Sequence, residues 1–348
     1  MKRPLSRRDF LKLSGLALGG LAFSPFLPEA GGFADGELVR VATTSVSVHV
    51  QPNDEYRIVN TWPRDSVLHV YETVTAETPD YNPIWYRVWG GYVHRERLQK
   101  VKIIHNEPAS TIPDPGLLGE ITVPYSQAYT YSSFAGWQTT YRLYYESVHW
   151  IKGVETGPDG GPWYRILDEL DEAIYYVPAR DVRLIPPAEL APISPEIPFE
   201  GKRIEVSLAT QTLTCFEYDR PVFETTVASG RAGLNGPNGE PTHTPAGRFN
   251  IQVKMPSKHM GDADLAAGID DYVIPGVPWV CFFTTRGHAF HGTYWHDNFG
   301  VPMSHGCLNM RTAEAKWLFR WTLPAAPFEE IDELTLDRKG FGTPVHIF

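Results

Sequence analysis

The stretch Ser-His-Gly-Cys-Leu-Asn-Met, Ser304–Met310, places an imidazole, a glycine and a thiol in consecutive positions, and the pair His291-Gly292 lies a short way upstream. A thiol attacks a carbonyl group as the thiolate, so it needs a base within hydrogen-bonding reach. It also needs N–H donors at the place where the oxyanion forms. The stretch therefore offers the parts of a cysteine acyl-transfer site.

Two histidines compete for the role of the base. His305 lies only two residues before Cys307, whereas a histidine on another strand has more freedom to orient toward the sulfur. We therefore expect His291 to be the base. The backbone N–H groups of Gly306 and Cys307, together with that of His305, are expected to bind the oxyanion, and Ser304 to steady His305 or a substrate amide.

Two other interpretations of this cluster stay open on the residues alone. A structural cysteine near a turn is the commoner fate of a lone Cys accompanied by two His. A zinc site is the other, because His291, His296, His305 and Cys307 lie close together in the sequence. The spacings typical of zinc ligands, such as H-E-x-x-H and C-x-x-C, are absent, so no metal is expected.

The chain from Gly201 to the C-terminus predicts a β-rich domain around this stretch. Apolar and polar residues alternate from Ile204 to Leu208, a return strand follows at 213–218, and 342–347 is typical of a closing strand. The segment 255–278 is too mixed in character to assign and is expected as a flap over a site. Thr312 is expected to cap a helix whose buried face carries Ala315, Leu318, Trp321 and Thr322.

Two further β-domains are predicted upstream. Residues 36–103 contain short strand-like runs, and this segment ends in Trp85–Val88, Gly90–Val93 and Leu98. That ending resembles the bacterial SH3-like domains, which are small β-barrels. In the second of the two β-domains, the aromatic residues between Tyr125 and Trp150 are expected mainly in the barrel core, and a sugar-binding platform is the alternative.

A weaker copy of the same unit occupies 117–187. Its Trp163–Ile166 lies 78 residues after Trp85–Val88, and Tyr176-Val177 repeats the ending. An internal repeat is the economical account. Five prolines between 186 and 198 then indicate a stiff, extended linker, assigned to 188–200, and the clearest domain boundary in the chain.

The first 34 residues have the character of a targeting segment. A basic start is followed by an apolar run from Leu13 to Phe23 and by small residues up to Ala34. Ser6–Lys12 (SRRDFLK) resembles the twin-arginine export signal. The resemblance implies export of a folded protein to the cell wall, periplasm or extracellular space, with no membrane span after signal cleavage.

Charge and cysteine content narrow the function further. The net charge is −10, and it becomes more negative without the basic start, so no nucleic-acid partner is expected. Three Cys in 348 residues exclude a disulfide framework. Cys215 and Cys281 sit in apolar, strand-like runs, where a buried and inert thiol is expected.

His291-Gly292 followed by Ser304–Asn309 resembles the signature of the L,D-transpeptidase (YkuD-type) catalytic domain. The hairpin at Gln211 and the segments 227–230, 244–249 and 342–345 resemble the same domain, so the likeness covers residues 201–348. The predicted fold is mainly β: two small SH3-like barrels followed by a β-rich catalytic domain with one or more short helices.

The family resemblance also implies roles for individual residues. Cys307 is implied as the nucleophile and His291 as the general base, oriented by the carbonyl group of Gly292, while His305, Gly306 and Cys307 form the oxyanion hole. Substrate binding is expected of Ser304, of Asn309, which stands where many relatives have Arg, and of Arg311. Only 12 residues separate His291 from Ser304, fewer than is usual in the signature, which leaves the shape of the acceptor site open.

The implied activity is cysteine acyl transfer on peptidoglycan peptide stems. Cys307 would release D-alanine from a tetrapeptide stem, and an amine of a neighbouring stem would resolve the thioester as a 3→3 cross-link, without a cofactor. The SH3-like domains would contact the wall, which is an inference from analogy. Two alternatives remain: an L,D-carboxypeptidase that uses the same site, and a non-catalytic wall-binding protein. The acceptor amine, the stem diamino acid and the oligomeric state stay open.

Overall fold

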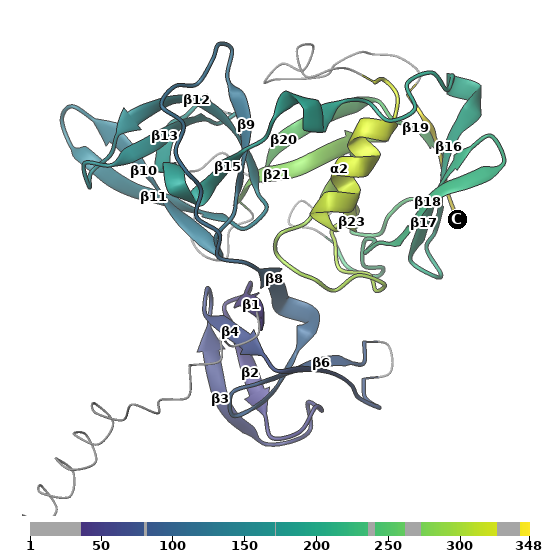
Figure 1. Cartoon of the computed structure of the whole chain (residues 1–348). Coiled ribbons are helices and arrows are strands. Elements are labelled where there is room, and N and C mark those ends of the chain that lie inside the picture. Colours follow the sequence, from purple (N-terminus) through teal and green to yellow (C-terminus); the bar gives the residue numbers. More distant parts are fainter. Residues whose placement is uncertain (1–35, 80–81, 171, 236–240, 262–272, 326–341) are drawn as a thin grey trace, which may run out of the picture. The chain divides into compact units, whose positions relative to one another are not determined.

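The computed structural model describes residues 36–79, 82–170, 172–235, 241–261, 273–325 and 342–348. Residues Glu37–Phe348 form one compact unit, which is mainly β (Figure 1). The expected targeting segment at 1–34 lies outside the described residues. Within them, no helix is long and apolar enough to cross a membrane.

The first β-domain, residues 37–101, is built from short strands in two sheets, ordered β4-β1-β8 and β3-β2-β7-β6-β5. Alternating valines supply its core, since Val39, Val41 and Val48 are fully buried together with Trp85. Its elements are β1 (Glu37–Val41), β2 (Ser45–His49), β3 (Ile58–Pro63), β4 (Val67–Val70), β5 (Glu72–Thr75), β6 (Ile84–Val88), β7 (Gly91–His94), the 3-10 turn η1 (Arg95–Arg97) and β8 (Leu98–Val101).

The second β-domain, residues 117–184, is a single sheet ordered β11-β10-β14-β13-β12-β9-β15. Its strand pairing repeats that of the first: Tyr86 pairs with Val93, and Tyr164 pairs with Val177. The two Trp-Tyr-Arg segments thus occupy corresponding strands. The elements are β9 (Leu117–Ile121), β10 (Tyr125–Ser132), β11 (Gly136–Tyr144), β12 (Val148–Thr156), β13 (Pro162–Leu167), β14 (Ile174–Pro178), the 3-10 turn η2 (Ala179–Asp181) and β15 (Val182–Leu184).

The proline-rich segment is packed, so the expectation of an extended linker at 188–200 is wrong. It contains two 3-10 turns, η3 (Pro187–Leu190) and η4 (Phe199–Gly201). Leu190 is buried, and Arg320 Nε donates to the carbonyl oxygen of Ala191 at 2.8 Å. Apolar side chains at Leu190 and Ile193 hold the segment against the C-terminal domain despite its prolines.

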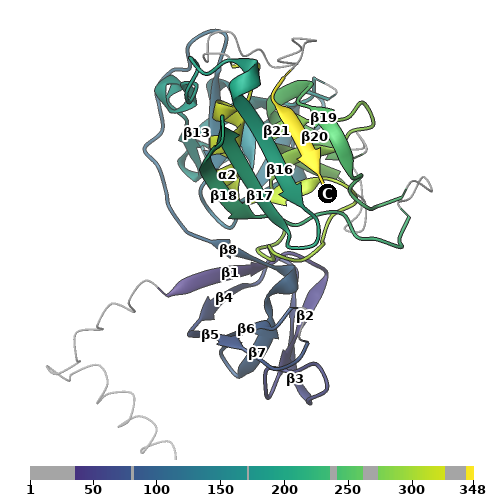
Figure 2. The same cartoon turned by 90° about the vertical axis from the view of Figure 1, so that its right-hand side faces the viewer.

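The C-terminal domain, residues 201–348, contains two sheets and a helix that packs against β21 and β22. Figure 2 shows β16, β17 and the C-terminal strand of the first sheet, ordered β18-β17-β16-β24-β19; the second is ordered β20-β21-β22-β23. The elements are β16 (Lys202–Ser207), β17 (Thr212–Glu217), β18 (Arg220–Thr226), β19 (Gly247–Asn250), β20 (Val253–Gly261), β21 (Val273–Phe282), β22 (Ala289–Gly292), β23 (Leu308–Met310), α2 (Thr312–Trp321) and β24 (Pro344–Ile347).

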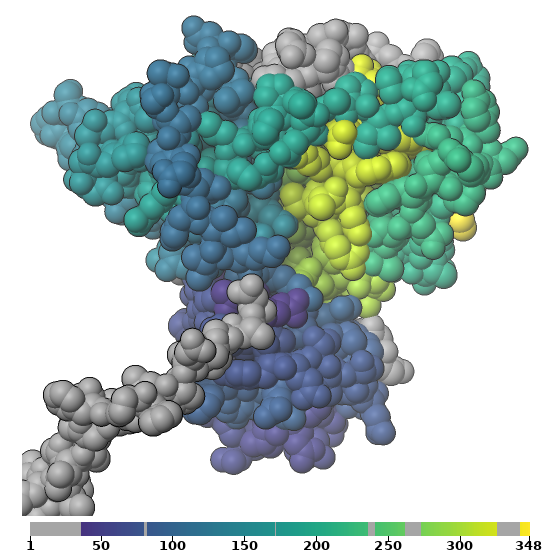
Figure 3. Space-filling view, viewed as in Figure 1, coloured from purple at the N-terminus to yellow at the C-terminus, as the bar shows by residue number. Residues whose placement is uncertain are grey.

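One hydrophobic core joins the second β-domain to the C-terminal domain. Leu118, Val148 and Trp150 belong to the same buried cluster as Leu308 and Leu318. In the space-filling view of Figure 3, helix α2 is the yellow-green patch between segments of these two domains. Strand β23, which follows Cys307, pairs with β22, and α2 packs against β22 and β21.

Two local expectations need correction. Residues 255–278 are not a flap where they are described, because β20 and β21 pair as antiparallel strands, while 262–272 lie outside the described residues. Thr312 is the first residue of α2 and not its cap; Arg311 holds the N-cap position, without a side-chain cap hydrogen bond. The expected buried face of this helix is confirmed, with Ala315, Leu318 and Trp321 at most 1% exposed.

Candidate active site

The candidate site is built on two parallel strands. In the pairing of β22 with β23, Phe290 lies beside Leu308 and His291 beside Asn309. Side chains alternate between the faces of a sheet, so His291 and Asn309 share one face. Cys307 directly precedes β23. His291 and Asn309, 18 positions apart in the sequence, are thereby brought onto neighbouring strands.

Cys307 is partly exposed, and its thiol rests in the protonated form. Its Sγ lies 3.6 Å from the carbonyl oxygen of Gly287. Burial of the sulfur raises the pKa of Cys307 to about 11, although the backbone N–H of Ala289 works in the opposite direction. A thiol with such a pKa is a poor nucleophile until a base removes its proton. Cys215 and Cys281 are fully buried, as expected for inert thiols.

His291 is a neutral imidazole with a defined tautomer. Its ring is 2% exposed, and Nδ1 lies 3.0 Å from the carbonyl oxygen of Gly292. A carbonyl oxygen only accepts, so Nδ1–H donates and Nε2 keeps its lone pair. Burial lowers the pKa of His291 to about 4. The Nε2 atom can therefore act as a base at neutral pH.

Ser304 stabilises the turn that carries the cysteine. Its Oγ donates to the carbonyl oxygen of Cys307 at 2.5 Å and accepts from the N–H of Gly306 at 3.1 Å. In this structure the Ser304 hydroxyl bonds within its own turn, and its expected contact with His305 or a substrate amide stays a prediction. The N–H of Gly306 is likewise directed at Ser304 and not at an oxyanion position.

Gly306 is required by the local geometry. Its φ of +124° lies in the region that L-residues avoid. A Cβ at this position would lie 2.9 Å from Cδ2 of His288, closer than such atoms approach. His288 is a residue outside the sequence motif, yet it packs beside the Cys307 turn, with Nδ1 2.9 Å from Thr284 Oγ1. Only its place shortly before His291 in the sequence pointed to it.

The remaining motif residues divide between surface and interior. His305 is exposed, and burial of part of its ring lowers its pKa. Asn309 is 1% exposed, with its side-chain amide 2.8 Å from His296 Nε2. Arg311 is at the start of α2, where Nη1 lies 3.2 Å from Oε1 of Glu314. Asn309 is thus buried and Arg311 contacts the first turn of α2, and the substrate contacts expected of both stay predictions.

The short loop between His291 and Ser304 is held by the first β-domain. Arg40 Nη2 donates to the carbonyl oxygen of Tyr294 at 3.0 Å. Arg95 donates from Nε to Oδ1 of Asn298 at 2.9 Å and from Nη2 to the carbonyl oxygen of Phe299 at 3.1 Å. The loop is therefore ordered by residues about 200 positions earlier in the chain, a relationship that no sequence motif indicates.

The histidines of this region have separate partners and do not converge. His291 bonds to its neighbouring carbonyl group, while His296 bonds to Asn309 and, through Nδ1, to the N–H of Asn298 at 3.1 Å. Among the described residues, no three His, Cys, Asp or Glu side chains gather in a metal-binding arrangement.

Comparison with known proteins defines the class of the C-terminal domain. Residues 201–347 match the family described as the L,D-transpeptidase catalytic domain, YkuD. The match covers the part of the chain for which the sequence resemblance implied this domain. No curated protein matches the chain.

Solved structures of L,D-transpeptidases are also similar to the chain. One is the protein from Xylanimonas cellulosilytica, with 22% identity and a TM-score of 0.31, covering 43% of this chain and 62% of that one. A mutant of the Enterococcus faecium enzyme has 24% identity and a TM-score of 0.31, covering 43% of this chain and 50% of the other. L,D-transpeptidase 3 from Mycobacterium tuberculosis has 19% identity and a TM-score of 0.30, covering 51% and 76%. The chain thus spans less than two thirds of the first two structures.

Proposed function

We propose that the protein is a peptidoglycan L,D-transpeptidase that uses Cys307 as its nucleophile and His291 as its general base. The observation that supports the proposal is the parallel pairing of β22, which carries His291, with β23, which Cys307 directly precedes, within residues that match the YkuD family model. The Nδ1–H of His291 donates to Gly292, which leaves Nε2 as the acceptor for the thiol proton.

The resting state of the pair constrains the first step. With a thiol pKa of about 11 and an imidazole pKa of about 4, both groups are neutral at pH 7. We infer that proton transfer from Sγ to Nε2 accompanies attack on the carbonyl carbon. The tetrahedral intermediate collapses when Nε2 returns that proton to the leaving amine, so D-alanine departs and a thioester remains. An acceptor amine then attacks the thioester, loses its proton to Nε2 and expels the thiolate, which is reprotonated.

The oxyanion donor is assigned differently from the family expectation. Because Ser304 Oγ accepts the N–H of Gly306, we assign the N–H of Cys307 as the principal donor. Thr244 Oγ1 donates to the carbonyl oxygen of Gly306 at 2.9 Å, which fixes the orientation of the Gly306–Cys307 peptide. In this proposal Ser304 and Thr244 position the peptide, and neither touches the substrate.

The test of the proposal uses purified protein and tetrapeptide muropeptides, with the products separated by mass. Transpeptidation gives free D-alanine and cross-linked dimers, whereas tripeptide monomers without dimers identify a carboxypeptidase instead. Cys307→Ala should abolish release of D-alanine, and the matched variant Cys215→Ala, which alters a buried thiol elsewhere in the domain, should retain it. Unchanged release in Cys307→Ala would exclude the assigned nucleophile, whereas no release of D-alanine by the unaltered chain would point to a non-catalytic wall-binding protein.

We also propose that the second β-domain contacts the cell wall through an aromatic surface. Trp137 lies 5.0 Å from Tyr131, 5.1 Å from Tyr176 and 6.1 Å from Trp163 between ring centroids. Tyr131 is 55% exposed, so part of this cluster faces solvent and not the barrel core. Exposed aromatic rings that lie together suit stacking on sugar rings.

Wall binding is tested by sedimentation of the full chain with purified peptidoglycan. Trp137→Ala should lower the bound fraction, whereas Trp89→Ala, which removes an 80% exposed indole from the first β-domain, should not. Equal binding by both variants would mean that the aromatic surface of the second β-domain does not bind the wall and that this domain only spaces the catalytic domain from it. We also propose that residues 1–34 direct export of the protein across the cytoplasmic membrane, which would place it beside its peptidoglycan substrate.

A further inference from the structure

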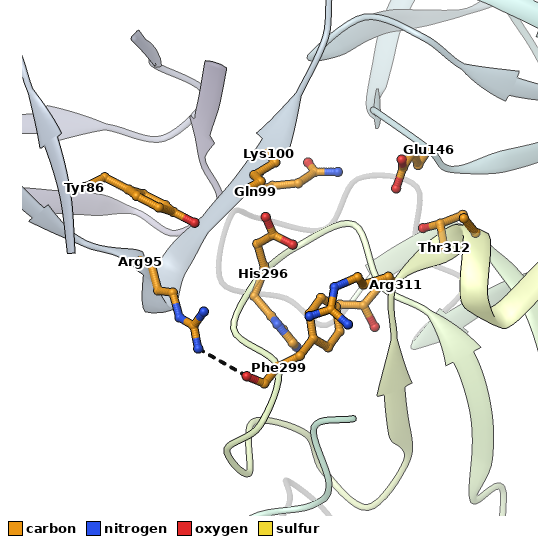
Figure 4. A pocket seen from close by; sticks show the side chains of 12 residues that line it. Tyr86, Arg95, Gln99, Lys100, Glu146, His296, Phe299, Arg311 and Thr312 are labelled. Carbon is orange, nitrogen blue, oxygen red and sulfur yellow. Dashed lines mark hydrogen bonds between the residues drawn. The ribbon is translucent and has the colours of Figure 1, made fainter. Parts of the chain in front are cut away.

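A cavity lies apart from Cys307, at the other end of the β22–β23 pair. Its volume is about 330 Å³, and its lining includes Thr293, which follows β22, and Arg311–Ala313, which follow β23. Along an extended strand, Arg311 is about 13 Å from Cys307. Figure 4 shows the lining: residues of the first β-domain on one side, Glu146 of the second β-domain and the start of α2 on the other.

One part of this cavity has features that favour binding of a negatively charged group. The N-terminus of the ten-residue helix α2 opens into it, and Arg311 at the N-cap position makes no side-chain cap hydrogen bond. The first N–H groups of such a helix carry partial positive charge and need acceptors. Arg95, Lys100 and Arg311 add three cationic side chains to the lining.

Another part of the lining carries two carboxyl groups, and the charges of Lys100, Arg311 and Arg95 act on that of Asp297. Asp297 and Glu146 both line the cavity, and neither forms an ion pair within 4.0 Å among the described residues. Oδ2 of Asp297 is buried and has no hydrogen-bond partner in the same set. Burial raises the pKa of both carboxyl groups, to about 7 for Glu146, where the Thr312 hydroxyl moderates the effect. Two carboxyl groups without an ion-pair partner within 4.0 Å among the described residues therefore line the cavity and can accept from a positively charged donor.

Backbone strain and an unused hydroxyl group support a binding role. Glu146 has a φ of +66°, a conformation that a side chain other than glycine rarely adopts, and it lies in the turn before β12. Thr293 lines the same cavity and is 4% exposed, and its Oγ1 atom has no hydrogen-bond partner among the described residues. Buried polar groups are normally satisfied, so an unpaired hydroxyl in a cavity indicates a missing partner.

The lining carries both cationic and carboxyl side chains, and this combination determines which class of ligand the cavity can bind. A simple anion would meet the carboxyl groups of Glu146 and Asp297, and a simple cation would meet Arg95, Lys100 and Arg311. A molecule that carries both charges satisfies both parts of the lining. We propose that this cavity binds a small free amino acid as the zwitterion, with its carboxylate at the N-terminus of α2 beside Arg311 and its ammonium group between Glu146 and Asp297.

The size of the cavity agrees with this ligand. A volume of about 330 Å³ holds roughly ten water molecules, or glycine or alanine with a few waters. The site also reaches the catalytic strands. His296 lines the cavity and bonds to Asn309, two residues after Cys307, and Thr293 is two residues after His291. An occupied site would therefore hold the ends of both strands.

The proposal is tested by isothermal titration of the full chain carrying Cys307→Ala, which cannot turn over substrate. Glycine, D-alanine and L-alanine are the probes, and saturable binding with a Kd on the order of 1 mM is expected. Glu146→Gln and Asp297→Asn should each weaken binding by about tenfold or more, because each removes a charged acceptor. The matched control is Glu155→Gln, which alters an exposed carboxylate on β12 of the same domain and should bind normally.

Two results would overturn the proposal. No saturable binding by any of the three amino acids, in protein whose thermal unfolding is cooperative, would make the cavity a water-filled gap. Inorganic phosphate that binds as well as glycine, with affinity unchanged by Glu146→Gln, would make it an anion site. Because binding is measured in the Cys307→Ala chain, neither result bears on whether the protein is a transpeptidase, which the muropeptide experiment decides.

Discussion

The side chains of His296 and Asn309 lie 2.8 Å apart in the interior of the C-terminal domain. His296 Nδ1 accepts the N–H of Asn298, and burial lowers the pKa of His296 to about 3, so the ring is neutral. Its single proton is therefore on Nε2, and the oxygen of the Asn309 amide must accept it. This orientation also satisfies an amide oxygen that is otherwise buried without a partner.

We expect His296→Ala to destabilise the protein by about 2 kcal/mol, because the Asn309 amide and the N–H of Asn298 lose their partners. Urea unfolding measures the loss, and His305→Ala, at an exposed position of the same motif, is the control with little change. The ¹⁵N chemical shifts of the His296 ring report the tautomer independently. A proton on Nδ1 would contradict the assignment.

Stability is expected to fall as the pH drops from 6.5 toward 4. Burial lowers the pKa of His149 and of His296 to about 3 and that of His291 to about 4, against 6.5 in the unfolded chain. Below pH 6.5 the unfolded state therefore binds protons that the folded state does not, which favours unfolding. Glu146 opposes this effect, since its pKa is raised to about 7 and the folded state takes up its proton first.

The net uptake on unfolding near pH 5.5 is roughly one to two protons, or roughly 1.5 to 3 kcal/mol per pH unit. Urea unfolding at several pH values between 7 and 4.5 measures this slope. His149→Asn should reduce it by about one proton. A free energy of unfolding that stays constant over this range would show that the three rings are protonated in the folded protein.

Alkylation by iodoacetamide is expected to modify one thiol, that of Cys307, because Cys215 and Cys281 are buried. The rate should rise about tenfold per pH unit from pH 7 to 10, since the thiolate fraction grows toward a pKa of about 11. Mass spectrometry of the intact protein follows the reaction, and Cys307→Ser should gain no adduct. A rate that is already constant at neutral pH would instead indicate a preformed thiolate–imidazolium pair.

Arg40 and Arg142 both contact Asp65, and they allow a matched comparison. Arg40 Nη1 lies 2.9 Å from Oδ1 of Asp65 with its side chain 2% exposed, whereas Arg142 Nη1 lies 2.5 Å from Oδ2 with its side chain 45% exposed. Arg40→Met should cost about 3 kcal/mol, because a buried carboxylate loses its buried partner. Arg142→Met should cost less than about 1 kcal/mol.

The urea midpoints of the two variants measure this difference. Arg40 also donates to the carbonyl oxygen of Tyr294, so Arg40→Met is expected to loosen the loop between His291 and Ser304 and to slow release of D-alanine. Equal midpoints would mean that the first β-domain contributes little to the stability of this loop.

Much of the architecture followed from local patterns. Alternating apolar residues at Ile204, Val206 and in the closing segment predicted strands that the structure contains, because a strand with one buried face needs that alternation. The helix after Met310 was predicted from the spacing of Ala315, Leu318 and Trp321. The segment 255–278 was not, since its prolines and charges mask strands that are stabilised by pairing with each other.

The sequence by itself determined the chemical content of the candidate site: a cysteine beside a glycine, a histidine followed by a glycine, and around them a β-rich domain that matches one family model. Only the tertiary structure decided how these groups are engaged. It directed Ser304 and Gly306 at each other, buried Asn309 against His296, and turned Arg311 to the start of α2. The physical reason is that a motif specifies side-chain types, whereas burial, hydrogen-bond partners and protonation depend on residues far along the chain, such as Arg95 and Glu146.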